Sequence, residues 1–223
     1  MISVSVIRTA QVDIPLRAVY RYLGYGRTTP DQNISALIQR CRGEVAVASA
    51  YQACWGVVPI HVTGTTVNLS ILQVESRALS RNLHGCEQAI LFAATLGAGV
   101  DQLRLRAEIT SPTRALILDA VGTAAVEAWC DQLCEQFRSR FAEQGLKLRP
   151  RFSPGYGDLS LSLQRPLLDA LRAPSRIGVS LTRAQLMVPQ KSVSAIVGLS
   201  TAGCEQVGQD CATCSQENCA FRL

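Results

Sequence analysis

The stretch SPTRALILDAVGTAAVEAWCDQLCEQFRSRFAEQG, residues 111–145, decides the fold class. Ser111 is a good N-cap and Pro112 suits the first turn of a helix, so together they mark where a helix begins. Apolar residues then recur along one face of that helix, namely Leu116, Ala120, Ala124, Ala128 and Leu133. The pattern predicts one long helix that crosses the core of the protein.

The half of the chain before this helix mixes helical and strand patterns. The predicted elements are a strand at 1–9, helices at 12–26 and 31–54, two strands within 57–69, a helix at 75–86, a strand at 89–97 and a helix at 97–109. Asp31 or Asn33 is the expected cap of the second helix, and Gly64 marks a tight turn between the paired strands. Gly97-Ala98-Gly99 is only a weak match to a phosphate-binding loop.

The half after the long helix begins with an irregular segment, residues 147–164, which is rich in Pro and Gly. A helix at 165–173 and strands at 176–182 and 191–200 follow. Long helices combined with antiparallel hairpins favour an α+β fold with a mixed or antiparallel sheet over a doubly wound sheet. Residues 1–200 are therefore predicted to form one domain, and residues 201–223 a separate cysteine-rich tail.

Composition narrows the class of protein. The chain has 223 residues, 48% hydrophobic and 17% charged, which suffices for a continuous buried core. Its net charge of +5 is scattered without a basic block, so no nucleic-acid partner is predicted. The N-terminus lacks the pattern of a secretion signal, and no segment reaches the ~18 apolar residues that span a bilayer. We expect a cytoplasmic protein with no membrane partner.

Two motifs in the second half of the chain occur in a recognisable order: RFSPGYGD at residues 151–158 and MVPQKSVSAIVG at residues 187–198. With AAVEAWCDQL at residues 124–133, they resemble the signature of the activation domain of cobalamin-dependent methionine synthase. The short chain is more similar to the free-standing, single-domain members than to the domain fused to a complete enzyme. The resemblance implies the α+β fold of that domain and a site for S-adenosylmethionine.

The site residues that the resemblance implies come from two of these segments. They are Glu127 on the long helix and, in the turn, Arg151, Phe152, Ser153, Pro154, Gly155 and Tyr156. Arg151 is expected to bind the ligand carboxylate through two parallel hydrogen bonds, and Glu127 to bind the ammonium group or a ribose hydroxyl. Glycine and proline in the turn would let the main chain approach the ligand and stiffen it. No residue is expected to act as a catalytic acid or base.

Each of these residues also has an ordinary structural explanation. Taken alone, Arg151 could be a solvated surface cation, Glu127 an exposed helix residue and the Pro-Gly pair a simple turn. Lys191, Ser192 and Ser194 are expected to be structural, and His61 and His84 to be ordinary surface or core residues. The cysteines before the tail, Cys41, Cys54, Cys86, Cys130 and Cys134, are expected to be small core residues.

The activity that the resemblance implies is reductive methylation. Inactive cob(II)alamin on a partner receives one electron, and the resulting cob(I)alamin is methylated by S-adenosylmethionine. The implied partners are a separate cobalamin-binding methionine synthase subunit and an electron donor such as flavodoxin or ferredoxin. Two alternatives remain open: reactivation of another corrinoid methyltransferase protein, and a non-catalytic metal-binding adaptor with the same fold.

The tail holds four of the nine cysteines, Cys204, Cys211, Cys214 and Cys219, spaced C-x6-C-x2-C-x4-C. Thiolates are soft ligands, and four of them suit a tetrahedral zinc or an iron-sulfur cluster. An iron-sulfur cluster is the preferred hypothesis, because a one-electron carrier would be useful beside a cobalamin-reducing site. The alternative is a flexible tail with incidental thiols.

Overall fold

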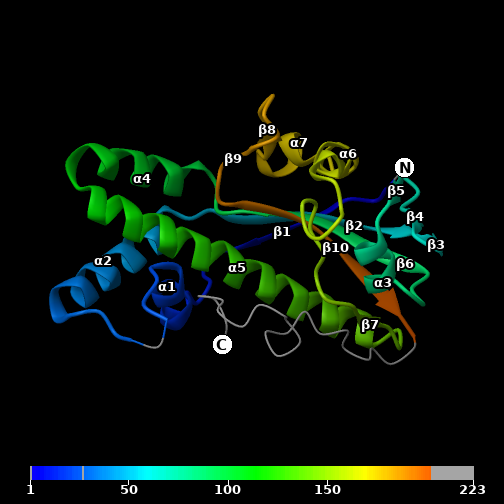
Figure 1. Ribbon diagram of the computed structural model, residues 1–223, viewed down its shortest axis with the longest axis horizontal. Coiled ribbons are helices and arrows are strands. Elements are labelled where there is room, and N and C mark those ends of the chain that lie inside the picture. The colour runs from blue at the N-terminus through cyan, green and yellow to red at the C-terminus, as the bar shows by residue number, and fades with distance from the viewer. Residues whose placement is uncertain (1, 27, 202–223) are drawn as a thin grey trace.

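The computed structural model describes residues 2–26 and 28–201. A five-stranded sheet lies at its centre, with strand order β1-β2-β6-β10-β7 and every pair antiparallel (Figure 1). Its strands are β1 (Ser5–Thr9), β2 (Tyr51–Pro59), β6 (Gln88–Thr95), β7 (Lys147–Leu148) and β10 (Ser192–Ser200). The predicted α+β fold class is confirmed.

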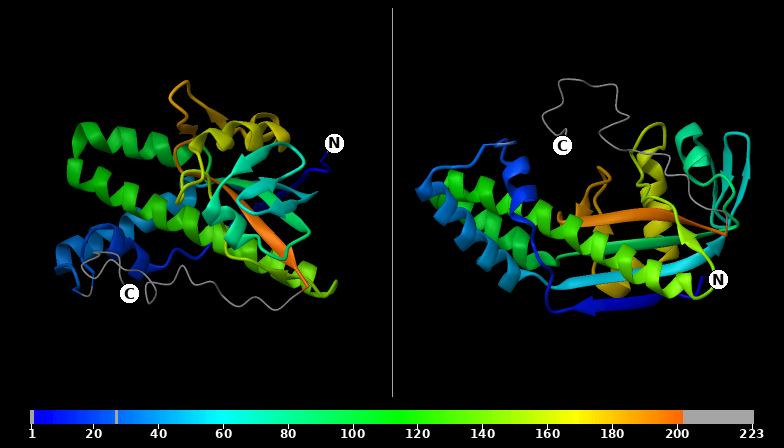
Figure 2. Two further views of the ribbon diagram at one scale, coloured as in Figure 1. Left: turned by 45° about the vertical axis from the view of Figure 1, so that its right-hand side comes forward. Right: turned by 90° about the horizontal axis from the view of Figure 1, so that it is seen from below.

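Shorter strands form two further sheets, and helices cover the central one. The short strands are β3 (His61–Thr63), β4 (Thr66–Asn68), β5 (Gln73–Glu75), β8 (Ser180–Leu181) and β9 (Met187–Val188). The helices are α1 (Leu16–Tyr22), α2 (Gln32–Ala48), α3 (Arg77–Asn82), α4 (Ala98–Thr110), α5 (Pro112–Ala142), the 3-10 turn η1 (Leu161–Leu163), α6 (Gln164–Ala170) and α7 (Ala173–Ile177). Figure 2 shows the three-stranded sheet β3-β4-β5 at one end of the molecule and α1 and α2 at the other.

The central sheet is buried on both faces, which explains the continuous apolar run in β6. Successive side chains of a strand point to opposite faces. Accordingly, Ile90 and Phe92 belong to a core shared with α1, α2, α4 and α5, whereas Leu91 and Ala93 belong to a second core shared with α3, α6 and α7. The molecule therefore has three layers, with the sheet between two sets of helices.

Helix α5 forms over the predicted residues and is the longest helix described. The Ser111 side chain accepts a hydrogen bond from the Arg114 amide (3.4 Å), and Pro112 occupies the first turn. Trp129 and Phe137 are among its fully buried side chains, whereas Leu116 is 64% exposed and lies outside the buried face that was predicted to include it. Neither α5 nor any other helix within residues 2–26 and 28–201 is long and apolar enough to cross a membrane.

Several predicted boundaries are wrong: the helices expected at 12–26 and 75–86 are shorter, at Leu16–Tyr22 and Arg77–Asn82, and two further differences have a clear physical reason. The helix expected to reach residue 54 ends at Ala48, and β2 begins at Tyr51. The β2 residues pair with β1 on one side and β6 on the other, and these non-local contacts override the local helical pattern. The strand expected at 176–182 is reduced to Ser180–Leu181, because α7 extends to Ile177 and Gly178, at φ 70°, ends it.

The glycines before α4 have a structural explanation. A Cβ added to Gly99 would lie 2.3 Å from the backbone oxygen of Ala48. Gly97, with φ 73°, precedes the helix and would bring a Cβ to 3.2 Å from the Cβ of Ala50. Both glycines therefore allow α4 to begin against the end of α2, and no phosphate-binding role is needed to explain them.

Candidate functional site

In the part of the chain that the structure describes, one edge of the central sheet is open along part of β10. On that side β7 pairs with Leu199 and Ser200, and the Arg149 amide donates to the Gly198 carbonyl (2.8 Å). Phe152 makes a single bridge to Ile196 with hydrogen bonds of 2.9 and 2.8 Å. Alternate residues of an antiparallel strand direct their N–H and C=O groups to the same side. The main-chain groups of Ser194 therefore face the open edge, as those of Ile196 face Phe152.

A pocket of about 480 Å³ lies at this edge. Its lining comes from α5, from the loop between β7 and η1, from α6 and from the β9–β10 segment: Glu127, Pro150, Arg151, Ser153, Pro154, Tyr156, Gln164, Met187, Ser192, Val193 and Ser194. Figure 1 shows the loop running from β7, beside α5, past β10 to α6. The three sequence motifs, distant along the chain, thus meet at one pocket.

Five of the seven predicted site residues line this pocket, whereas Phe152 and Gly155 do not. Phe152 is 1% exposed and belongs to the core, where its ring packs edge-on to Tyr156 at 6.4 Å between centroids. Gly155 has φ 91°, a backbone conformation that favours glycine, and its amide donates to the Leu159 carbonyl (2.9 Å). These two residues shape the loop that carries the others.

Arg151 reaches across to α5 and pairs with two carboxylates. Its Nη2 lies 3.1 Å from Glu127 Oε2 and 2.8 Å from Asp131 Oδ1. The Arg151 side chain is 24% exposed. Burial acts to lower the pKa of Arg151, but the surrounding negative charges, those of Glu127 and Asp131 among them, hold the pKa above its ordinary value. Arg151 is therefore a fixed cation.

These pairs modify the expected role of Arg151. A carboxylate that accepts two parallel hydrogen bonds from a guanidinium uses either its Nε and Nη2 or its Nη1 and Nη2. Both pairs include Nη2. Glu127 and Asp131 already engage that nitrogen, while no acceptor among the described residues contacts Nε or Nη1. A ligand carboxylate would therefore gain one hydrogen bond at first, and a second only if Glu127 or Asp131 moved.

Comparison with known proteins gives the fold a precedent. No protein-family model and no curated protein sequence matches the chain. The solved structure of the MetH reactivation domain bound to AdoHcy is similar, with a TM-score of 0.67 over 91% of this chain and 80% of that chain. This chain has the reactivation-domain fold. The two sequences are 14% identical, so the likeness establishes the fold.

Within the reactivation-domain fold, Asp158 has a role that sequence reasoning missed. Its carboxylate accepts hydrogen bonds from the Ser76 hydroxyl and from the amides of Arg77 (2.8 Å) and Ala78 (3.1 Å) at the start of α3. These bonds, that of Ser76 above all, lower the pKa of Asp158. Asp158 thereby fastens the pocket loop to α3.

We predict that this anchor weakens in acid. Because the pKa of Asp158 is lower in the folded protein than its ordinary value of 3.8, its contribution is complete well above that value and disappears as pH falls through the folded pKa. Asp158→Asn should therefore lower the denaturant midpoint at pH 7 and lower it much less at pH 3. Asp169→Asn, an exposed carboxylate on α6 for which no side-chain bond is described, is the control. An equal loss at both pH values would contradict the prediction.

Gln164 is a second residue at the pocket that the sequence did not predict. It is 5% exposed, lines the pocket, and its Oε1 is buried without a hydrogen-bond donor among the described residues. A buried acceptor left in this state costs about 1–3 kcal/mol. The sequence holds a signal for it, because Gln164 precedes Leu167, Leu168 and Leu171 at helical spacing and is a polar residue on an apolar face.

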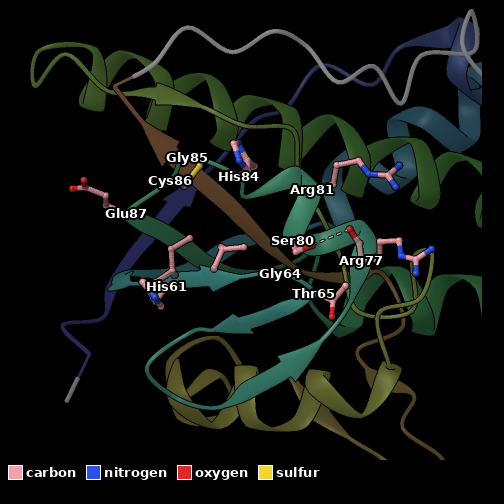
Figure 3. Close-up of a pocket in the computed structure, with 12 residues that line it drawn as sticks. His61, Gly64, Thr65, Arg77, Ser80, Arg81, His84, Gly85, Cys86 and Glu87 are labelled. Atoms are coloured by element: carbon pink, nitrogen blue, oxygen red, sulfur yellow. Dashed lines mark hydrogen bonds between the residues drawn. The ribbon is translucent and has the colours of Figure 1, made fainter.

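A second pocket, of about 740 Å³, lies where α3 meets the β3–β4 turn (Figure 3). Figure 3 shows Arg77 and Arg81 extending to one side and Glu87 to the other, so these charges do not converge on a common point. His61 and His84 line this pocket and are both exposed, in agreement with the expectation of ordinary surface residues. The pocket at the β10 edge is therefore the stronger candidate site.

Cysteines of the described region behave as core residues. Cys41, Cys54, Cys86 and Cys130 are buried, and Cys134 is partly buried. Burial raises the pKa of Cys134 to about 11 and that of Cys130 further, so both remain protonated beside Arg151. Within residues 2–26 and 28–201 no group of three or more His, Cys, Asp or Glu could hold a metal ion. The predicted metal ligands Cys204, Cys211, Cys214 and Cys219 lie outside the described residues.

Proposed function

We propose that this chain binds S-adenosylmethionine in the pocket at the β10 edge and supports reductive reactivation of cob(II)alamin on a separate methionine synthase subunit. The observation that carries the proposal is the meeting of Glu127, the 151–156 turn and the Met187–Ser194 segment around one pocket. Its volume of about 480 Å³ lies within the ~300–1,000 Å³ typical of small-molecule sites. The reactivation-domain fold, known with AdoHcy bound, adds support.

The charges of the pocket suit this ligand. Arg151 contributes one positive charge, and Glu127 and Asp131 contribute two negative charges, so the cluster carries a net charge of −1. S-adenosylmethionine carries a carboxylate, an ammonium and a sulfonium, which sum to +1. Asp131 is 72% exposed, so solvent screens much of its share, and Glu127 is the stronger partner for the ligand's cations.

The proposed work of the chain is to position the ligand. S-adenosylmethionine supplies a methyl group on a sulfonium, and one electron from a flavodoxin or ferredoxin converts cob(II)alamin to the cob(I)alamin that accepts this methyl. S-adenosylhomocysteine is the product that leaves. Arg151 and Glu127 would hold the amino-acid end of the ligand, and Tyr156, 54% exposed at the pocket rim, would cover it. Positioning of this kind can lower a barrier by ~7–11 kcal/mol.

The test has a binding arm and an activity arm. Calorimetry should detect S-adenosylmethionine binding to the purified full-length chain. In an anaerobic mixture with a cobalamin-loaded methionine synthase subunit and a reductant, the visible spectrum should change from cob(II)alamin to methylcobalamin only when chain and ligand are both present. Absence of heat at millimolar ligand would contradict the proposal and favour the adaptor alternative.

The identity of the corrinoid partner is a separate step of the proposal. A methionine synthase subunit is the partner that the resemblance implies, and a corrinoid protein of another methyltransferase is the alternative. Capture of cobalamin-binding proteins on the immobilised chain, followed by the same spectral assay with each captured protein, distinguishes the two. Methylation confined to a different corrinoid protein would replace the methionine synthase subunit in the proposal.

We further propose an iron-sulfur cluster on Cys204, Cys211, Cys214 and Cys219 as the route of the electron. Thiolate ligands fit either iron-sulfur or zinc. Iron and acid-labile sulfide should be present in anaerobically purified protein, and dithionite should bleach its visible absorption. A finding of zinc alone, or of no metal, would remove the cluster and leave the binding proposal unaffected.

A further inference from the structure

Gln164 supports an inference that rests on the proposed function and deepens it. The Gln164 side chain is almost completely buried at the pocket, and its Oε1 has no donor within the described residues. Nε2 is not among the buried atoms that lack a partner, so it is the Oε1 acceptor that needs one. A buried carboxamide oxygen needs a donor, and a ligand in the pocket can supply that donor together with an acceptor for the neighbouring Nε2.

Gln164 belongs to a different layer from the ion-paired cluster. Glu127 lies on α5, on one face of the sheet, whereas α6 packs against the other face. Arg151 and Glu127 are in direct contact, so they account for one end of an elongated ligand. Gln164 is then left for the other end, which in S-adenosylmethionine is the nucleoside.

We propose that Gln164 recognises the adenine base. Its Oε1 would accept a hydrogen bond from the 6-amino group, and its Nε2 would donate to the neighbouring ring nitrogen N7. A glutamine carboxamide matches this edge of adenine with two parallel hydrogen bonds, and such a pair is worth enough to discriminate between bases. The ribose hydroxyls are the alternative donors to Oε1. The experiment below distinguishes a bond to the ribose from a bond to the 6-amino group.

The test compares three compounds by calorimetry: S-adenosylhomocysteine, its counterpart with an unsubstituted purine in place of adenine, and its 2′-deoxyribose counterpart. The wild-type chain should bind the 6-amino compound about 5- to 150-fold more tightly than the purine compound. In Gln164→Met this preference should disappear. In Gln164→Glu, which retains an acceptor oxygen, the preference for the amino group should persist.

A ratio of affinities distinguishes recognition from a structural role. If Gln164 only supported the loop, its replacement would weaken both compounds equally and leave the ratio unchanged, which would overturn the proposal. A penalty for the 2′-deoxy compound that vanished in Gln164→Met would assign Gln164 to the ribose and also overturn it. Gln136→Met, on an exposed face of α5, is the control and should leave every ratio as in the wild type.

The outcome for the wild-type chain separates this proposal from the one on which it rests. If the wild-type chain binds S-adenosylmethionine and S-adenosylhomocysteine without preference for the 6-amino group, the proposed function stands and the role of Gln164 falls. If it binds neither compound, both proposals fall.

Discussion

Arg151→Ala is expected to weaken S-adenosylmethionine binding by about 30-fold or more, corresponding to ~2 kcal/mol or more. The substitution removes the cation that faces the ligand carboxylate and leaves Glu127 and Asp131 within reach of it. The net charge of the cluster changes from −1 to −2. A carboxylate brought to that place would meet repulsion instead of a hydrogen bond. Calorimetry at constant ionic strength measures the change.

Two further variants serve as controls for Arg151→Ala. Arg17→Ala, at an exposed position on α1, removes the same charge from the protein without touching the pocket and should not change the affinity. Arg151→Lys keeps the charge but loses the planar fork, so its affinity should lie between those of wild type and Arg151→Ala. An Arg151→Ala variant that binds as tightly as wild type would exclude Arg151 from the site.

Trp129→Ala should lower the free energy of unfolding by about 3–5 kcal/mol. Trp129 is fully buried in the middle of α5, its Nε1 donates to the Gln52 carbonyl (3.2 Å), and its ring packs edge-on to Tyr51 with centroids 6.1 Å apart. Truncation would leave a cavity between α5 and β2 and a carbonyl without its donor. Guanidinium-induced unfolding, followed by circular dichroism, measures the loss.

A control on the same helix isolates the effect of burial. Leu116 is also apolar and lies on α5, but it is 64% exposed, so Leu116→Ala should change stability by no more than about 0.5 kcal/mol. Trp129→Phe retains a ring against Tyr51 and should recover part of the loss. Similar losses in Trp129→Ala and Leu116→Ala would show that α5 does not form the core described above.

The central helix and the pocket residues were predictable because their signals are local. Ser111 and Pro112 mark the start of α5, and the motif around Arg151 is a continuous stretch of sequence. The start of β2 at Tyr51 was not predictable in this way. Residues 51–54 continue a helical pattern, and only their pairing with β1 and β6 makes them a strand.

Side chains that act through tertiary contacts were harder to predict. Asp158 belongs to the quoted motif, yet its function depends on α3, which lies about 80 residues earlier in the chain. Asp131 lies one turn after Glu127 on the same helix, a spacing that could have suggested the shared contact with Arg151. Phe152 and Gly155 were placed correctly in the loop, but their exposure to a pocket depends on how the loop folds.

The exposed margin of β10 has a consequence for solubility. Unpaired strand edges recruit other extended chains, and proteins guard them with charged or bulky groups. Here Arg151 and Tyr156 line the same pocket as Ser194, whose main-chain amide and carbonyl face this edge. Substitutions that open this loop are therefore expected to promote self-association through β10, separately from any effect on ligand binding.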